Sequence, residues 1–164
     1  MKNNISIPVV ILCGGEGLRL RPLTKNIPKP LIIINKKPIL SYVLKHLKEY
    51  GYKQFIIATG YKSKKIRDFM KNKFNSLNYK IVDSGNVDIL ARIKGCLQYI
   101  KGDFLLCYGD TISDINFSKL NQYHFVDPSS VTVSSFPISI PFGVMNLDKN
   151  SYVNSFTEKP TLDS

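Results

Sequence analysis

The 164-residue sequence contains no tryptophan, three cysteines and two histidines. It has no unbroken apolar run of membrane-spanning length, and its N-terminus lacks the charged and then apolar pattern of a secretory signal, so we expect no membrane association. Cys13, Cys96 and Cys107 are widely spaced in apolar contexts, which argues against a disulfide framework or a zinc site and favours buried, reduced thiols. These absences predict a cytoplasmic protein.

Acidic residues are scarce as well: the sequence has 12 Asp and Glu and 23 Lys and Arg, which gives a net charge of +11. The excess is almost all lysine and is spread over predicted helix faces. No base-reading module accompanies it, so a solvated basic surface is favoured over a nucleic-acid footprint, and we expect no nucleic-acid partner. The positive field would also attract a small polyanionic substrate.

Short β-branched runs alternate with longer amphipathic runs along the first two thirds of the chain. This alternation predicts an α/β fold of the Rossmann-like, doubly wound type, with a mostly parallel sheet and helices on both faces. Ligands of such sheets bind at the carboxyl ends of the strands. The pattern predicts strands over 8–13, 55–59, 79–82 and 104–108, helices over 38–50, 63–74 and 89–100, and polar or glycine-rich loops over 14–17, 83–88 and 109–114.

The chain length is that of one domain, which we place at 1–164. Its α/β core is expected over about 9–127, followed by a β-rich part over 128–164. That second part is predicted to contain strands over 131–136, 142–147 and 153–156, because its pattern changes to short strand-like pieces.

The segment from 9 to 31, "VVILCGGEGLRLRPLTKNIPKPL", places three glycines directly after a buried strand. Such a loop cradles phosphate, because backbone N–H groups can approach an anion where no Cβ intervenes. It is not a Walker loop, since Arg19 and Leu20 stand where the second Gly and the Lys are required, and Leu20 also breaks the dinucleotide-binding pattern. A tight strand-to-helix connection is the alternative. Arg19 can grip a triphosphate, and the prolines around Lys29 restrict its backbone.

The same segment closely resembles the signature of the sugar-1-phosphate nucleotidyltransferases. Further blocks agree in order: "GYKSKKIRDF" at 60–69, "YGDTISDINF" at 108–117, "FGVMNLD" at 142–148 and "FTEKP" at 156–160. In that family an oxygen of a phosphate monoester attacks the α-phosphorus of a nucleoside triphosphate and expels pyrophosphate. The family usually runs on well past the last block, so the resemblance leaves open a truncated nucleotide-binding module without catalysis. A homo-oligomer is also left open.

The resemblance implies a role for each matching residue. Arg19 and Lys29 would be catalytic, Asp110 would bind Mg²⁺, and Gly143, Glu158 and Lys159 would bind the acceptor. Asp114 is favoured as a helix cap over a second metal ligand. The nucleotide would be bound by Leu12, Gly14, Gly15, Glu16, Gly17, Leu18, Arg19, Lys29, Asp83, Ser84, Gly85, Arg92 and Tyr108.

The segment 82–106 looks most like glucose-1-phosphate cytidylyltransferases, which carry an Asp-Thr-Gly loop and an Arg-Leu-Lys helix start. The counterparts here, Asp83-Ser84-Gly85 and Arg92-Ile93-Lys94, make CTP the expected substrate and GTP the runner-up. Leu18 replaces the usual Thr or Ser, and Ile89-Leu90-Ala91 replaces small residues. The expected acceptor is a sugar 1-phosphate or a related phosphorylated small molecule, used in the synthesis of a surface polysaccharide or capsule precursor. The second change argues against glucose 1-phosphate itself, and a non-sugar acceptor such as phosphocholine or phosphoglutamine is the alternative.

Overall fold

The computed structural model describes residues 7–126 and 131–162. The chain divides into two compact units, Met1–Phe117 and Ser118–Ser164, and each is described by itself. Within the described ranges, no helix has the length and apolar character needed to cross a bilayer. The single-domain organisation stays a prediction.

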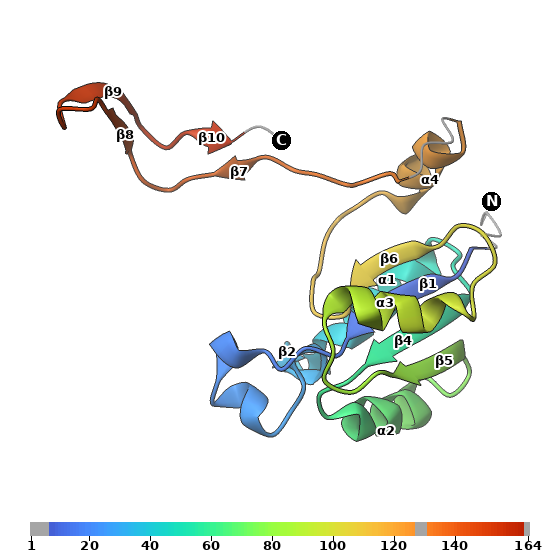
Figure 1. Ribbon diagram of the computed structural model, residues 1–164. Helices are drawn as coiled ribbons and strands as arrows, with labels where there is room; N and C mark the ends of the chain where they lie inside the picture. The colour runs from blue at the N-terminus through green and yellow to red at the C-terminus, as the bar shows by residue number, and fades with distance from the viewer. Residues whose placement is uncertain (1–6, 127–130, 163–164) are drawn as a thin grey trace. The chain divides into compact units, whose positions relative to one another are not determined.

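The first unit is built on a four-stranded parallel sheet with the strand order β5-β4-β1-β6. Figure 1 shows helix α3 in front of this sheet and helix α1 behind it, so the predicted doubly wound α/β fold is confirmed. The strands are β1 (Val9–Cys13), β4 (Gln54–Thr59), β5 (Asn78–Asp83) and β6 (Leu105–Tyr108), and the helices are α1 (Ile39–Glu49), α2 (Ser63–Lys73) and α3 (Ile89–Leu97).

Both faces of the central strand β1 are buried, which explains its unbroken apolar run. Side chains alternate along a strand, so Val10 and Leu12 share one face, where they pack with Cys96 of α3. Val9 and Ile11 point to the other face and are fully buried. Burial on both faces fixes the positions of the strand ends, where the loops begin.

Helix ends follow the local sequence closely. Helix α1 ends before Gly51, whose φ of 95° lies in the left-handed region that favours glycine. Helix α3 begins at Asp88, whose carboxylate accepts a 2.8 Å hydrogen bond from the N–H of Ala91. Its last turn was expected to reach Ile100, but the helix ends at Leu97.

Between β1 and α1 the chain forms a series of short elements that the sequence pattern did not predict. They are the 3₁₀ turns η1 (Leu18–Leu20), η2 (Leu23–Lys25) and η3 (Lys29–Leu31) and the small hairpin of β2 (Ile33–Ile34) with β3 (Lys37–Pro38). These turns carry the arginine and lysine side chains of the glycine-rich segment.

The second unit consists of helix α4, whose first residue closes the first unit, and two small antiparallel pairs. The predicted strand over 131–136 is wrong, because these residues form no regular structure and Pro137, which lacks an N–H donor, separates them from the first strand. Residues 128–130 of the predicted β-rich part lie outside the described residues. The elements are α4 (Phe117–Val126), β7 (Ile138–Ser139), β8 (Val144–Leu147), β9 (Val153–Thr157) and β10 (Thr161–Leu162).

Candidate functional site

Within the first unit, the loops that carry the predicted phosphate-binding and metal-binding residues lie at the carboxyl end of the sheet. Strands β1 and β6 run parallel with Leu12 opposite Tyr108, so Gly14 and Asp110 follow neighbouring strand ends. The N–H of Gly109 donates a 3.0 Å hydrogen bond to the carbonyl of Leu12. A Cβ at Gly109 would overlap the thiol of Cys13, so glycine is required for this close approach.

Lys29 and Asp110, 81 positions apart in the sequence, form an ion pair. The Lys29 Nζ lies 2.8 Å from Asp110 Oδ2, and the two side chains are 36% and 19% exposed. Lys29 opens η3 between Pro28 and Pro30, and the burial of Pro30 and Leu31 anchors this turn. The structure thus brings together the two residues expected to bind the α-phosphate and the metal.

The glycine loop folds back onto the turn that precedes Lys29. Gly17 has a φ of 64°, and a Cβ there would lie 3.0 Å from the Thr24 side chain and 3.3 Å from Lys29 Cβ. The Thr24 hydroxyl donates a 2.9 Å hydrogen bond to the Gly17 carbonyl. By contrast, a Cβ on Gly15 would have nothing within 4 Å, so the backbone there faces open space that an anion can enter.

The remaining predicted phosphate-loop residues are more exposed. Leu18 and Arg19 lie in η1 with no buried side chain. In the described part of the chain Arg19 makes no hydrogen bond or ion pair, so it is not brought into contact with Lys29 or Asp110. Glu16 pairs instead with Arg21, at 3.2 Å on the surface.

Arg92 lies under the glycine loop and ties it to the loop after β5. Its guanidinium is 5% exposed and donates to the carbonyls of Gly85 at 3.1 Å and Val87 at 3.0 Å, and to that of Thr59. A Cβ on Gly14 would overlap this guanidinium. No carboxylate pairs with Arg92 among the residues that the structure describes, so a buried cation lies beside the glycine loop without a compensating anion.

The other residues predicted to bind the nucleotide lie in the loop after β5 and at the end of β6. Asp83 Oδ1 accepts a 3.1 Å hydrogen bond from the N–H of Gly85, which has a φ of 65°. The N–H of Ser84 donates to the Thr59 carbonyl at 3.2 Å, and Tyr108 is 51% exposed at the end of β6. Their contact with a nucleotide stays a prediction.

In the second unit, the predicted acceptor-binding residues lie together. A Cβ on Gly143 would overlap the Phe156 ring and lie 3.0 Å from Glu158 Oε2. Lys159 has a φ of 46°, and its Nζ lies 3.9 Å from Glu158 Oε1 on the surface. The β8–β9 hairpin therefore presents a carboxylate and an ammonium side by side.

The thiols near the site are poor nucleophiles. Burial raises the pKa of the Cys13 thiol well above its ordinary value, and the charges of Cys107 and Asp110 raise it further. Burial raises the pKa of Cys107 to about 12. Cys13 and Cys96 are buried and Cys107 is partly buried, so the expectation of buried thiols is confirmed for the first two.

Three polar residues that the sequence analysis did not single out connect these loops: Thr24, Thr59 and Tyr61. The Thr59 hydroxyl shares a 2.8 Å hydrogen bond with that of Ser63 inside the protein. The N–H of Tyr61 donates to the carbonyl of Gly14 at 3.0 Å. For Thr59 and Tyr61, the sequence offers one indication of a role at the site, which is their place at the carboxyl end of a predicted strand.

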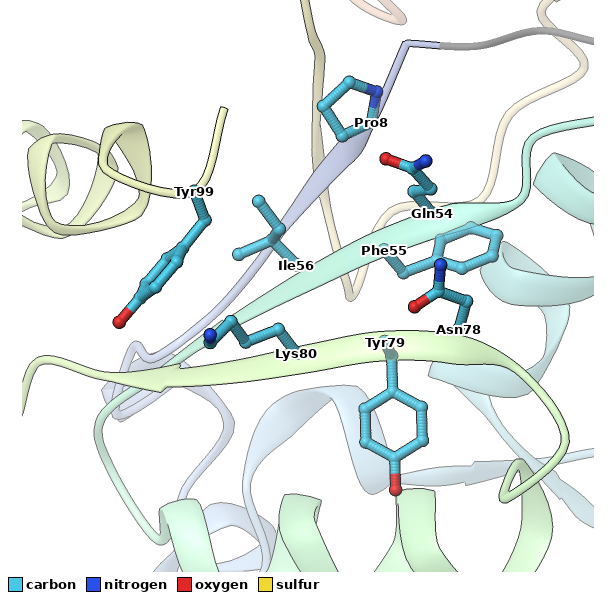
Figure 2. Close-up of a pocket in the computed structure, with 8 residues that line it drawn as sticks. All are labelled: Pro8, Gln54, Phe55, Ile56, Asn78, Tyr79, Lys80 and Tyr99. Atoms are coloured by element: carbon cyan, nitrogen blue, oxygen red, sulfur yellow. The ribbon is translucent and has the colours of Figure 1, made fainter. Parts of the chain in front are cut away.

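A cavity of about 450 Å³ lies at the opposite, amino end of the strands (Figure 2). Lys80 Nζ lies 3.9 Å from the centroid of the Tyr99 ring at its side, and Gln54 and Asn78 open the strands along it. None of the predicted site residues lines this cavity, so the chemistry is assigned to the carboxyl end.

Fold and site together define a nucleotidyltransferase: the model of the nucleotidyl transferase family matches residues 8–164, and the chain belongs to this family. The chain is 33% identical over 153 residues to D-glycero-alpha-D-manno-heptose 1-phosphate guanylyltransferase of Campylobacter jejuni, covering 92% of this chain and 67% of that protein. It is 35% identical over 178 residues to a probable glucose-1-phosphate cytidylyltransferase of Bacillus subtilis, covering 94% and 69%.

Solved structures agree with this assignment. The crystal structure of HddC from Yersinia pseudotuberculosis superposes with a TM-score of 0.73 at 27% identity, covering 93% of this chain and 69% of that one. HddC has also been crystallised with GMP-PN. The matched region therefore spans about two thirds of each of these relatives.

The family resemblance implies Mg²⁺, and the donors at Asp110 fit it. Within the described ranges, no group of three or more His, Cys, Asp and Glu side chains could hold a metal ion by itself. Mg²⁺ often takes one or two carboxylates and completes its shell with water and substrate phosphates. A single, partly exposed carboxylate beside the glycine loop suits that mode of binding.

Proposed function

We propose that this protein transfers CMP from CTP to a phosphate monoester and releases pyrophosphate. The observation that carries the proposal is the Lys29–Asp110 ion pair beside the open backbone of Gly15. Two anions must meet in this reaction, and a cation next to a phosphate-binding loop is what lowers their mutual repulsion.

Each residue of the site has a separate role in the proposed reaction. Backbone N–H groups of the glycine loop and Arg19 bind the triphosphate, and Lys29 moves from the Asp110 carboxylate to the α-phosphate. The acceptor oxygen forms a new bond to the α-phosphorus while the bond from that phosphorus to the β-bridging oxygen breaks, and its electron pair leaves with pyrophosphate. Asp110 would hold Mg²⁺, which supplies further neutralisation of phosphate charge when bound.

The choice of CTP rests on Arg92. Its guanidinium lies next to Gly14 and Gly60 and donates to the carbonyl of Gly85 at 3.1 Å, so it holds the Asp83-Ser84-Gly85 loop in place. The resemblance of this loop to the Asp-Thr-Gly loop of glucose-1-phosphate cytidylyltransferases supports CTP. Sequence identity does not discriminate between CTP and GTP, because the cytidylyltransferase relative is 35% identical to this chain and the guanylyltransferase relative is 33% identical. GTP is therefore the alternative nucleotide.

The acceptor is proposed to be a sugar 1-phosphate or a related small phosphate ester, with Gly143, Glu158 and Lys159 at its binding site. Ile89 and Leu90, exposed by 50% and 78%, stand where the resembling cytidylyltransferases have small residues, which favours an acceptor other than glucose 1-phosphate. Phosphocholine and phosphoglutamine are candidates, and the product would be a cytoplasmic precursor of surface polysaccharide or capsule.

The experiment is a release assay for pyrophosphate with the full chain. Each of CTP, GTP, UTP, dTTP and ATP is combined with Mg²⁺ and a panel of phosphate esters, and products are identified by mass. The highest turnover with CTP supports the proposal, and a preference for GTP selects the alternative. CTP binding without pyrophosphate from any acceptor would instead favour a nucleotide-binding module.

A further inference from the structure

Tyr61 joins the beginning of the glycine loop to the turn that precedes Lys29. Its N–H donates to the Gly14 carbonyl at 3.0 Å. Its phenol hydroxyl lies 2.9 Å from the carbonyl oxygen of Thr24 and 3.0 Å from that of Lys25, both in η2. One residue of the β4–α2 connection therefore bonds two segments of the glycine-rich region, one through its backbone N–H and the other through its side chain.

The end of the glycine loop is attached to the same turn. The hydroxyl of Thr24, a fully buried residue, donates to the Gly17 carbonyl, and Gly17 packs against the Lys29 side chain. The contacts Gly14–Tyr61–Thr24–Gly17 therefore close a ring around the loop, which we call the loop clamp. Within the loop clamp, the Tyr61 hydroxyl bonds the Thr24 carbonyl and so joins two segments that are 37 positions apart in the sequence.

We propose that Tyr61 is a positioning residue for nucleotide binding: its hydroxyl holds the glycine loop and the Lys29 turn in the relative arrangement that a triphosphate requires. This inference rests on the proposed function. A loop held in the bound arrangement loses less conformational freedom when the ligand binds, so preorganisation appears as tighter nucleotide binding.

The test is Tyr61→Phe, which removes the hydroxyl and keeps the ring and the N–H bond to Gly14. Tyr42→Phe is a matched control, because the Tyr42 hydroxyl also donates to two carbonyls, those of Ile34 at 2.9 Å and Asn35 at 3.3 Å, away from the glycine loop. We expect Tyr61→Phe to raise the KM for CTP about tenfold, the size of one to two lost hydrogen bonds, with the acceptor KM unchanged. Tyr42→Phe should leave both KM values unchanged.

Two readouts are independent of turnover. The Kd for CTP from calorimetry without acceptor should rise by the same factor. Amide hydrogen exchange of Leu20 and Lys25, whose N–H groups bond the carbonyls of Gly17 and Pro22 at 3.0 Å, should accelerate in Tyr61→Phe and stay unchanged in Tyr42→Phe. Thr24→Val, which removes the other hydroxyl of the loop clamp, should repeat both effects, and Thr24→Ser should restore normal binding.

The outcomes separate the two proposals. If the wild-type protein binds no nucleoside triphosphate, the proposed function fails and this inference fails with it. If the wild type binds CTP and both Tyr61→Phe and Thr24→Val keep its affinity, only the loop clamp is refuted. An equal loss of affinity in Tyr42→Phe would also refute it, because the effect would then be general destabilisation.

Discussion

Replacing Lys29 with alanine should remove most of the activity and little of the stability. The side chain pairs with Asp110 at 2.8 Å, but it is 36% exposed. Exposed ion pairs of this kind contribute about 1 kcal/mol or less, because solvent screens the attraction and both side chains lose freedom. We therefore expect the free energy of unfolding to fall by no more than about 1 kcal/mol.

The effect on the reaction should be much larger. A donor that stabilises developing charge in a transition state is worth about 2.7–4 kcal/mol, so kcat/KM for CTP should fall about 10²- to 10³-fold. Lys45→Ala is the control, since Lys45 also pairs with a carboxylate, Glu49 at 3.7 Å, on the exposed face of α1. Pyrophosphate release gives the rate, and urea unfolding followed by circular dichroism gives the stability. If Lys29→Ala and Lys45→Ala had the same kcat/KM, the assignment of the site would be refuted.

Three further predictions concern the surroundings of the site. Gly109→Ala should lower the free energy of unfolding by about 1–3 kcal/mol in urea, because its Cβ would overlap the Cys13 thiol; an unchanged midpoint would contradict this packing. Arg92→Met should cost about 1–3 kcal/mol by leaving buried carbonyls unpaired, and the ratio of kcat/KM for CTP to that for GTP should fall; an unchanged ratio would remove Arg92 from base selection. The pKa of Cys107, raised from 9.0 to about 12, means that the folded protein keeps a proton that the unfolded chain releases, so the free energy of unfolding should fall between about pH 9 and 12 by up to about 1.4 kcal/mol per pH unit. Cys107→Ala should lose that part of the slope in urea titrations at several pH values, and an identical slope in both proteins would contradict the burial of this thiol.

Most of the fold was predictable because its signal is local. The apolar run of β1 requires burial on both faces, and parallel strands place their carboxyl ends at one edge of the sheet. That geometry places Asp110 beside the glycine loop, but Lys29 reaches Asp110 through the irregular turns η1 to η3, so only the family resemblance pointed to their meeting. The strand predicted over 131–136 is wrong because a local pattern cannot show whether a strand finds a partner. Its β-branched residues fit a strand, but no described strand pairs with them.

The parts of the site that escaped prediction depend on side-chain direction. Arg92 was expected to bind the nucleotide, but no periodicity reveals that its guanidinium would lie against Gly14 and bond the carbonyl of Gly85. Tyr61 was part of a matching block without an assigned role, because the partners of its hydroxyl lie in irregular 3₁₀ turns. Such turns have no repeating pattern that a sequence displays.

The ion pair between Lys29 and Asp110 affects which anions can bind to the protein before substrate arrives. An incoming ligand has to compete with a carboxylate that already neutralises the ammonium, so a small free ion such as orthophosphate gains little by replacing it. A chain of three phosphates reaches the glycine turn and the lysine at once, and its first contact holds it in place for the exchange. We expect the site to discriminate by ligand length as well as charge, and so to stay open to substrate among the abundant simple anions of a cell.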